Sequence, residues 1–156
     1  MAAFGALFLL TVTGALLAPI PVLTLTDGRS QVVVSLSDGE PYVYSYVNSI
    51  YDAPVEERHL RVHDHLSITE VRSPDIRAVE YFRWDGRIRA AGGAYEQAAP
   101  PNQAGRLAIR VTPAYQQRLA GAGWTVDLAG TFGDGVVQVS PERLPILVAL
   151  LRGWRP

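Results

Sequence analysis

The chain has 156 residues, 48% of them hydrophobic and 19% charged, which suits one globular domain with a single core. Its formal net charge is −1, and its 14 basic residues, all arginines, are scattered along the chain, so we expect no nucleic-acid partner. The chain contains no cysteine, which excludes disulfides, thiolate metal sites and cysteine nucleophiles.

The first 26 residues carry no charged side chain, and residues 2–18 form a predominantly apolar run. As a helix this run would be about 26 Å long, near the lower limit for crossing a bilayer, and Pro19 and Pro21 are expected to end it. We therefore interpret residues 1–18 as an N-terminal hydrophobic helix, either a membrane anchor or a cleaved signal segment. A buried core helix is the remaining alternative, although it would lack the polar face of a surface helix.

Residues 19–156 are expected to form one β-rich domain, which the anchor or signal would deliver outside the cytoplasm, in the cell envelope. Short β-forming runs alternate there with turn residues. Asp-Gly, the preferred pair for a tight type I′ hairpin turn, occurs at residues 27–28, 38–39, 85–86 and 134–135. This spacing predicts an all-β fold, an antiparallel sandwich or an open barrel. The expected strands cover residues 22–26, 29–37, 42–50, 56–62, 66–72, 76–84, 87–91, 106–112, 124–128 and 136–140. Apolar side chains alternate onto one face along 29–37 (Val32, Val34, Leu36) and along 106–112 (Leu107, Ile109, Val111).

Two segments outside these strands stand out. A short C-terminal helix is expected to begin at Pro141 after a Ser140 cap, and its apolar stretch 144–151 is too short to span a membrane. This stretch is expected to pack on the sheet, with a place in the lipid headgroup region, beside Trp154, as the alternative. The Gly- and Pro-rich segment 92–105 is expected to be a long surface loop, and loops of this length are often functional.

The stretch YVNSIYDAPVEERHL, residues 46–60, gathers polar side chains between two strands. Asp52 and Pro54 favour a sharp connection, in which Asn48, Ser49 and Asp52 bond to backbone groups. We therefore interpret this stretch as a loop between strands.

A catalytic interpretation of the same stretch is the alternative. Side chains alternate along a strand, so Glu57 and His59 share a face, and an enzyme acting through Ser49, Glu57 and His59 is conceivable. No nucleophile-elbow motif surrounds Ser49, however, and an ion pair of Glu57 or Glu56 with an arginine is the simpler expectation. We interpret the tyrosines at 42, 44 and 46 as packing residues.

The three histidines are weak candidates for a metal site. His59, His63 and His65 occupy odd positions, as ligands on one face of a strand would, and imidazole suits zinc or copper. The turn expected at Asp64 breaks that face. Exposed turn histidines are therefore the expectation, with no cofactor or metal.

The strands on either side of Asp85-Gly86 are expected to pair as a two-residue hairpin. In that register Trp84 faces Arg87 and Phe82 faces Arg89. The resulting face is interpreted as a cation–π ladder that stabilises the sheet, with an aromatic and arginine surface for a partner or anionic ligand as the alternative. Trp84, Arg87 and Arg89 are binding candidates on that alternative.

The order of LLAPIPVLTLTDG, YVNSIYDAPVEER, RVHDHLSITEVRSP, the EYF segment and GRLAIRVTPAYQQRL resembles the DUF1850 family of small bacterial proteins, often encoded beside TRAP-type transporters of the TAXI class. The resemblance covers nearly the whole chain. Its Ser-x-x-x-x-Pro-Val-x-Glu core corresponds to Ser49, Pro54, Val55 and Glu57, which with Asn48 are binding candidates. Asn48 stands where a His is expected in many relatives, which argues against a general base there.

The resemblance implies a genomic context and no reaction. We therefore expect a membrane-tethered extracytoplasmic β domain that serves as an accessory or interaction module of a TAXI-class transporter and contacts its membrane subunit. An exported domain that binds a small ligand or a metal is the second hypothesis, and the enzyme described above is the third. No phosphate-binding loop, paired catalytic carboxylates or nucleotide fingerprint is present in the sequence.

Overall fold

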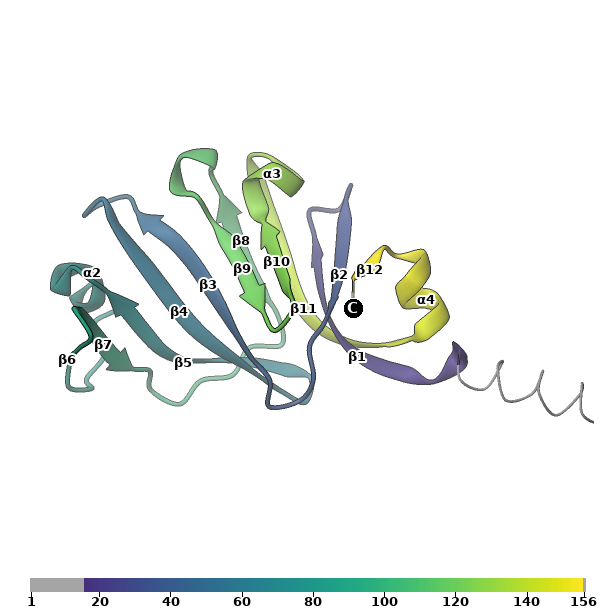
Figure 1. The fold of residues 1–156 in the computed structure, drawn as a ribbon, viewed down its shortest axis with the longest axis horizontal. Helices are drawn as coiled ribbons and strands as arrows, with labels where there is room; N and C mark the ends of the chain where they lie inside the picture. The colour runs from purple at the N-terminus through teal and green to yellow at the C-terminus, as the bar shows by residue number, and fades with distance from the viewer. Residues whose placement is uncertain (1–15, 156) are drawn as a thin grey trace, which may run out of the picture.

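The computed structural model of this chain describes residues 16–155, so the hydrophobic helix expected over 1–18 lies almost entirely outside the described residues (Figure 1). The all-β expectation is confirmed, because strands make up most of the structure and the helices are short. None of the helices within 16–155 has both the length and the apolar character needed to cross a membrane. The elements are β1 (Pro19–Thr26), β2 (Gln31–Ser35), β3 (Pro41–Asn48), β4 (Ala53–Val62), β5 (His65–Ser73), α2 (Ile76–Glu80), β6 (Arg89–Ala91), β7 (Ala94–Ala98), β8 (Leu107–Val111), the 3₁₀ turn η1 (Pro113–Tyr115), β9 (Arg118–Gly121), β10 (Trp124–Asp127), α3 (Leu128–Phe132), β11 (Gly135–Pro145), α4 (Ile146–Leu151) and β12 (Trp154–Arg155).

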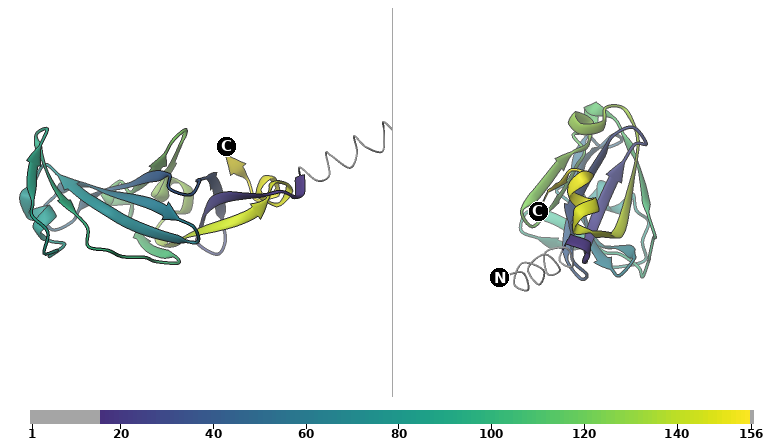
Figure 2. Two further views of the ribbon diagram at one scale, coloured as in Figure 1. Left: turned by 90° about the horizontal axis from the view of Figure 1, so that it is seen from below. Right: turned by 90° about the vertical axis from the view of Figure 1, so that its right-hand side faces the viewer.

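The strands form two sheets. The smaller sheet has the order β12-β2-β1-β11-β8, and the larger has the order β10-β9-β3-β4-β5-β7-β6. Neighbouring strands are antiparallel except for β12, which runs parallel to β2. The molecule is elongated, with α2 at one end and α4 at the other (Figures 1 and 2).

The two sheets share the largest hydrophobic core. Leu23 and Val34 reach it from the smaller sheet, and Leu66 and Leu119 reach it from the larger one. The alternation expected along β2 is confirmed. Val32 and Val34 point into this core, whereas Val33 points to the opposite face of the sheet, beneath α4. Both faces of β2 are therefore covered, which explains its unbroken valine run.

One buried arginine joins the sheets. Arg61, on β4 of the larger sheet, is 1% exposed and donates to the carbonyl oxygens of Val22 (2.7 Å), Leu36 (3.1 Å) and Glu142 (2.9 Å), which all belong to the smaller-sheet side. Its Nε also donates to the carbonyl of His63 at 2.9 Å. Burial lowers the pKa of Arg61 from its ordinary value. The guanidinium is satisfied by backbone carbonyls that approach it from three separate segments.

The hairpin expected around Asp85-Gly86 is wrong. The first expected strand is instead the helix α2, because Asp75 accepts a hydrogen bond from the backbone N–H of Arg77 (3.0 Å) and so caps a helical turn. The buried amide of Gln97 donates to the carbonyls of Trp84 (2.8 Å) and Gly86 (2.6 Å), and this holds the segment against β7. The chain therefore passes Asp85-Gly86 without forming a hairpin.

The other Asp-Gly pairs do not form the expected type I′ turns either, since none of the four aspartates has a positive φ. The carboxylate of Asp27, for example, accepts from the backbone N–H groups of Arg29 (2.8 Å) and Ser30 (2.6 Å). Asp27 therefore stabilises its loop through its side chain, as Asx residues do.

Two boundaries also differ from expectation. Part of the loop expected over 92–105 is the strand β7, which pairs with both β5 and β6. The C-terminal helix begins at Ile146 and not at Pro141, because residues 141–145 pair with β1 as part of β11. Pro145 disfavours a helical backbone conformation at the residue before it, so α4 starts directly after Pro145.

Replacement of Arg61 tests its role in joining the sheets. Arg61→Met is expected to lower the free energy of unfolding by roughly 3 kcal/mol or more, because buried carbonyl oxygens lose their donor. Arg58→Met, on the same strand, is the control: Arg58 is half exposed and paired only with Glu70, so a change within about 1 kcal/mol is expected. Urea denaturation of both variants measures the difference, and equal losses would contradict this role.

Candidate functional site

The stretch over 46–60 forms a loop between two strands, as expected. It connects β3 to β4, and the side-chain oxygen of the buried Asn48 accepts from the backbone N–H groups of Ile50 (2.9 Å) and Tyr51 (3.2 Å). Asp52 adopts a positive φ of 49°, which this residue type tolerates better than most. Asn48 is therefore a loop-stabilising residue.

This loop determines which side chains meet on the hairpin. Asn48 pairs with Ala53, and continuing along the ladder Tyr44 lies opposite Glu57 and Tyr42 lies opposite His59. Since side chains alternate along strands, Tyr42, Tyr44, Glu57 and His59 all point to the same face of the larger sheet.

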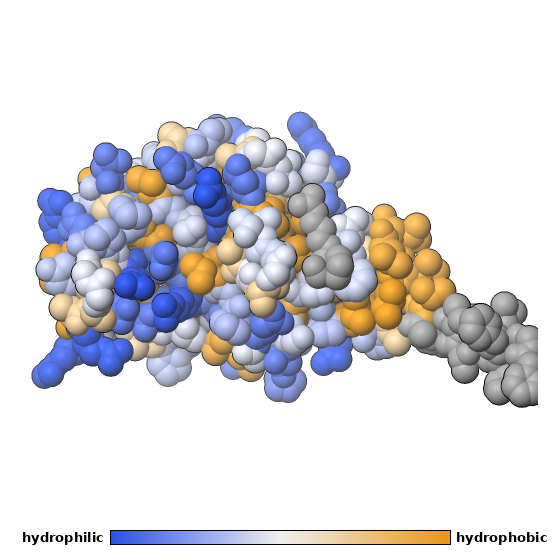
Figure 3. Space-filling model, viewed as in Figure 1, coloured by the Kyte–Doolittle hydropathy of each residue, from blue (hydrophilic) through white to orange (hydrophobic). Residues whose placement is uncertain are grey.

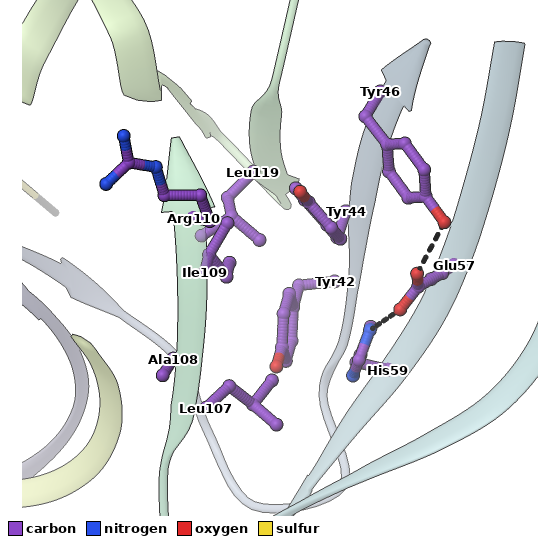
Figure 4. A pocket seen from close by; sticks show the side chains of 10 residues that line it. All are labelled: Tyr42, Tyr44, Tyr46, Glu57, His59, Leu107, Ala108, Ile109, Arg110 and Leu119. Carbon is purple, nitrogen blue, oxygen red and sulfur yellow. Dashed lines mark hydrogen bonds and ion pairs between the residues drawn. The ribbon is translucent and has the colours of Figure 1, made fainter. Parts of the chain in front are cut away.

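A pocket of about 330 Å³ lies over this face (Figure 4). One wall comes from β3 and β4 of the larger sheet and the other from β8, the edge strand of the smaller sheet, with β9 behind. Its size is at the lower end of the range for small-molecule sites. The lining residues are Tyr42, Tyr44, Tyr46, Glu57, His59, Leu107, Ala108, Ile109, Arg110 and Leu119.

A polar network runs along the β3–β4 wall. The hydroxyl of Tyr46 donates to Oε1 of Glu57 at 3.0 Å, and Nε2 of His59 lies 3.2 Å from Oε2 of the same carboxyl group (Figure 4). The ring of Tyr42 stacks on His59, with centroids 5.0 Å apart and planes 19° from parallel. The expected ion pair of Glu57 or Glu56 with an arginine is therefore wrong: the partners of Glu57 are a tyrosine and a histidine, and Glu56 forms no ion pair with any described residue.

Two polar atoms in this wall lack a partner. Tyr42 is 1% exposed and His59 is 4% exposed, yet the Tyr42 hydroxyl and Nδ1 of His59 make no hydrogen bond to any described residue. The hydroxyl of Tyr44 differs, because it accepts from Nε2 of Gln117 at 2.7 Å. Buried polar groups are nearly always paired, because an unpaired one costs about 1–3 kcal/mol. Both atoms belong to stacked side chains that line the pocket, so this wall is the candidate for contact with a ligand.

The pocket keeps its phenols in the neutral form. Burial raises the pKa of Tyr42 well above its usual value, and Glu57 raises it further. Burial likewise raises the pKa of Tyr44 to about 12, and burial together with Glu57 raises the pKa of Tyr46. All three hydroxyls are therefore hydrogen-bond donors throughout the physiological range.

The structure separates the members of the expected catalytic set. Glu57 and His59 are in contact, but Ser49 is exposed in the loop at the end of the hairpin. Glu57 lies four residues along β4 from Ala53, the partner of Asn48, which amounts to about 13 Å of strand. The expected convergence of Ser49 on the Glu57–His59 pair does not occur.

Pro54 and Val55, the other residues of the Ser-x-x-x-x-Pro-Val-x-Glu motif, do not line the pocket. Val55 is fully buried in a second core beneath α2, and Pro54 is exposed on the neighbouring position. The motif therefore combines a loop position, a core position and one pocket residue, Glu57.

The histidines do not come together. His59 lies in the pocket, His63 is exposed with its Nε2 3.8 Å from Asp38, and Nδ1 of His65 lies 2.8 Å from Asp64. Over residues 16–155 no three His, Asp or Glu side chains are placed to hold one metal ion.

The aromatic and arginine face expected around Asp85-Gly86 is also not formed. Trp84 is half-buried against Phe82, with ring centroids 4.8 Å apart, and both pack on the core beneath α2. Arg87 and Arg89 are exposed, and Arg89 lies opposite Glu96 on β7. These residues lie outside the pocket.

The pocket could have been found partly from the sequence. The tyrosines at 42, 44 and 46 looked like packing residues, although a tight loop over 49–52 already places Tyr44 opposite Glu57 and Tyr42 opposite His59. The contribution of β8 could not be predicted from the sequence, because β8 and β3, which lie on opposite sides of the pocket, are distant in the chain.

Two conservative substitutions compare the paired and the unpaired hydroxyl. Tyr42→Phe is expected to leave the free energy of unfolding unchanged or raise it by up to about 1 kcal/mol, because it removes a buried group without a partner. Tyr44→Phe is expected to lower it by about 1 kcal/mol, because Gln117 loses an acceptor. Chemical denaturation of the ligand-free protein measures both, and a larger loss for Tyr42→Phe than for Tyr44→Phe would contradict the assignment.

Comparisons were made with protein-family models, with curated proteins and with solved structures. None of the three gives a match to this chain. The resemblance to the DUF1850 family therefore stays a prediction, and the geometry of the pocket is the main support for a function.

Proposed function

We propose that this protein binds a small, uncharged and mostly apolar molecule carrying a hydroxyl group, in the pocket between β3, β4 and β8. The observation that carries the proposal is the pair of buried polar atoms without partners, the Tyr42 hydroxyl and Nδ1 of His59. The proposed ligand hydroxyl pairs with these two atoms.

The chemistry of the pair selects a hydroxyl. Glu57 accepts a hydrogen bond from Tyr46 and lies beside Nε2 of His59, so Nε2 is the natural site of the imidazole proton. In the neutral imidazole Nδ1 is then an acceptor, whereas the Tyr42 hydroxyl can donate. A group that accepts from Tyr42 and donates to Nδ1 fits this pair, and an alcohol or phenol does both.

The other walls select an apolar body. Leu107 and Ile109 of β8 face the tyrosine rings across the pocket, and Leu119 of β9 lies beside Tyr44. Such surfaces favour a flat or aliphatic skeleton. The carboxyl group of Glu57 would repel a carboxylate. The guanidinium of Arg110 does not compensate, because it is exposed and already paired with Asp134 at 2.8 Å.

Fragment binding to the full-length protein tests this proposal. Phenol and cyclohexanol are expected to raise the melting temperature in a concentration-dependent way, whereas toluene and benzoate are expected to have little effect. Tyr42→Phe should weaken phenol binding about tenfold, which corresponds to one hydrogen bond of about 1.4 kcal/mol. Tyr95→Phe, in the separate core beneath α2, is the matched control and should bind phenol normally. Equal binding of phenol and toluene, or an unaffected Tyr42→Phe, would contradict the proposal.

We further propose that the domain acts outside the cytoplasm, tethered to the membrane by its first 18 residues, as an accessory module of a TAXI-class transporter. The charge-free first 26 residues support the tether, and the resemblance to the DUF1850 family supports the partner. An enzyme acting through Ser49 is not favoured, because Ser49 lies apart from Glu57 and His59.

Co-purification tests the transporter partnership. The full-length chain carrying an affinity tag at its C-terminus should retain the transporter membrane subunit in detergent extracts of a host that encodes both. Deletion of the gene for this chain from the host should reduce solute uptake several-fold. Failure to co-purify, together with normal uptake in the deletion strain, would rule out an accessory role.

A further inference from the structure

The end of the molecule that carries α4 exposes a cluster of leucines. Leu147, Leu150 and Leu151 are 43%, 51% and 80% exposed, and Leu17, just before β1, is 59% exposed. In Figure 3 this end shows a continuous hydrophobic surface, whereas the rest of the visible face is mixed. We call these four residues the leucine patch.

The exposed side of α4 is not required to hold the helix on the domain. Ala149 is fully buried and packs with Val22 and Val33 on the outer face of the smaller sheet, with Val148 beside them. The opposite side of the helix carries the leucines of the patch, where a surface helix ordinarily carries polar residues. Exposed apolar clusters of this kind mark contact surfaces.

The patch lies where the apolar N-terminal run enters the domain. The backbone N–H of Ile146, the first residue of α4, donates to the carbonyl of Ala18 at 3.2 Å. Residues 2–18 are predominantly apolar, so the patch is continuous with a segment proposed to lie in the bilayer. A lipid surface is therefore the occupant that fits this side of α4.

We infer that the leucine patch inserts into the outer surface of the bilayer and forms a second membrane contact beside the N-terminal tether, on whose existence this inference rests. Trp154 follows α4 and is half-buried, with its indole N–H donating to Ser35 at 3.0 Å. Arg152 is partly exposed beside Glu142. Trp154 packs with Ala149 on the sheet side of α4, whereas an arginine next to an inserted apolar helix is typical of the headgroup level.

Two membrane contacts would orient the domain. The long axis of the molecule runs from α4 to α2, and the strands that line the pocket lie between them (Figure 1). With α4 in the bilayer surface, the pocket stands clear of the lipid and remains open to the surrounding solution.

Spin labelling of the full-length chain tests this contact, and the absence of native cysteines makes single labels clean. A label at Leu151→Cys, in vesicles of zwitterionic lipid, is expected to be relaxed more by oxygen than by a water-soluble nickel chelate. Ala90→Cys, exposed on β6 at the far end, is the control and should show the reverse. When Leu147→Glu and Leu150→Glu are added to the Leu151→Cys chain, the label should be relaxed more by the nickel chelate than by oxygen.

The outcomes separate this contact from the tether. Co-flotation of the chain with the vesicles reports the tether alone. A chain that floats while the Leu151 label favours the nickel chelate overturns the α4 contact and leaves the tether intact. A label shielded from both reagents also overturns the contact, because a protein and not lipid would then cover the patch. A chain that does not float overturns both.

Discussion

The two sheets depend on one buried arginine. Arg61 leaves β4 and reaches backbone carbonyls of the smaller sheet, and no carboxylate is among its four acceptors. Carbonyl acceptors are part of the main chain, so the guanidinium fork sets the positions of strands and not of flexible side chains. His59, which lines the pocket, lies two residues before Arg61 on β4, so this contact between the sheets is close to the pocket along the strand. The pocket lies between the same two sheets, which also share the largest hydrophobic core.

The side chains on the inner face of β4 make three different kinds of contact along the strand. Ala53 and Val55 pack beneath α2, Glu57 and His59 line the pocket, and Arg61 joins the sheets. Val55 is fully packed and the guanidinium of Arg61 is paired with carbonyls, whereas His59 and the stacked Tyr42 each leave one polar atom without a partner among the described residues. The polar atoms without partners therefore lie between two well-packed regions of the same strand.

The failed hairpin shows where local patterns mislead. Residues 76–84 contain β-forming residues and precede Asp-Gly, yet the cap by Asp75 and the burial of Ala78 and Val79 against the larger sheet favour a helix. The amide of Gln97 then binds the segment that follows, and Gln97 lies on a strand that the sequence presented as a loop. The competing interactions are of similar strength locally, so contacts from another part of the chain decide between them.

By itself, the sequence determined what depends on neighbouring residues: the all-β class, the β3–β4 connection and the alternation along β2 and β8. The tight β3–β4 connection in turn places the tyrosines on the same face as Glu57 and His59. Only the tertiary structure decided what depends on distant contacts: the place of α2, the partners of Arg61 and Glu57, and the meeting of β8 with β3 that encloses the pocket. Side-chain alternation and turn chemistry act over a few residues, whereas the packing of one sheet on another is a property of the whole chain.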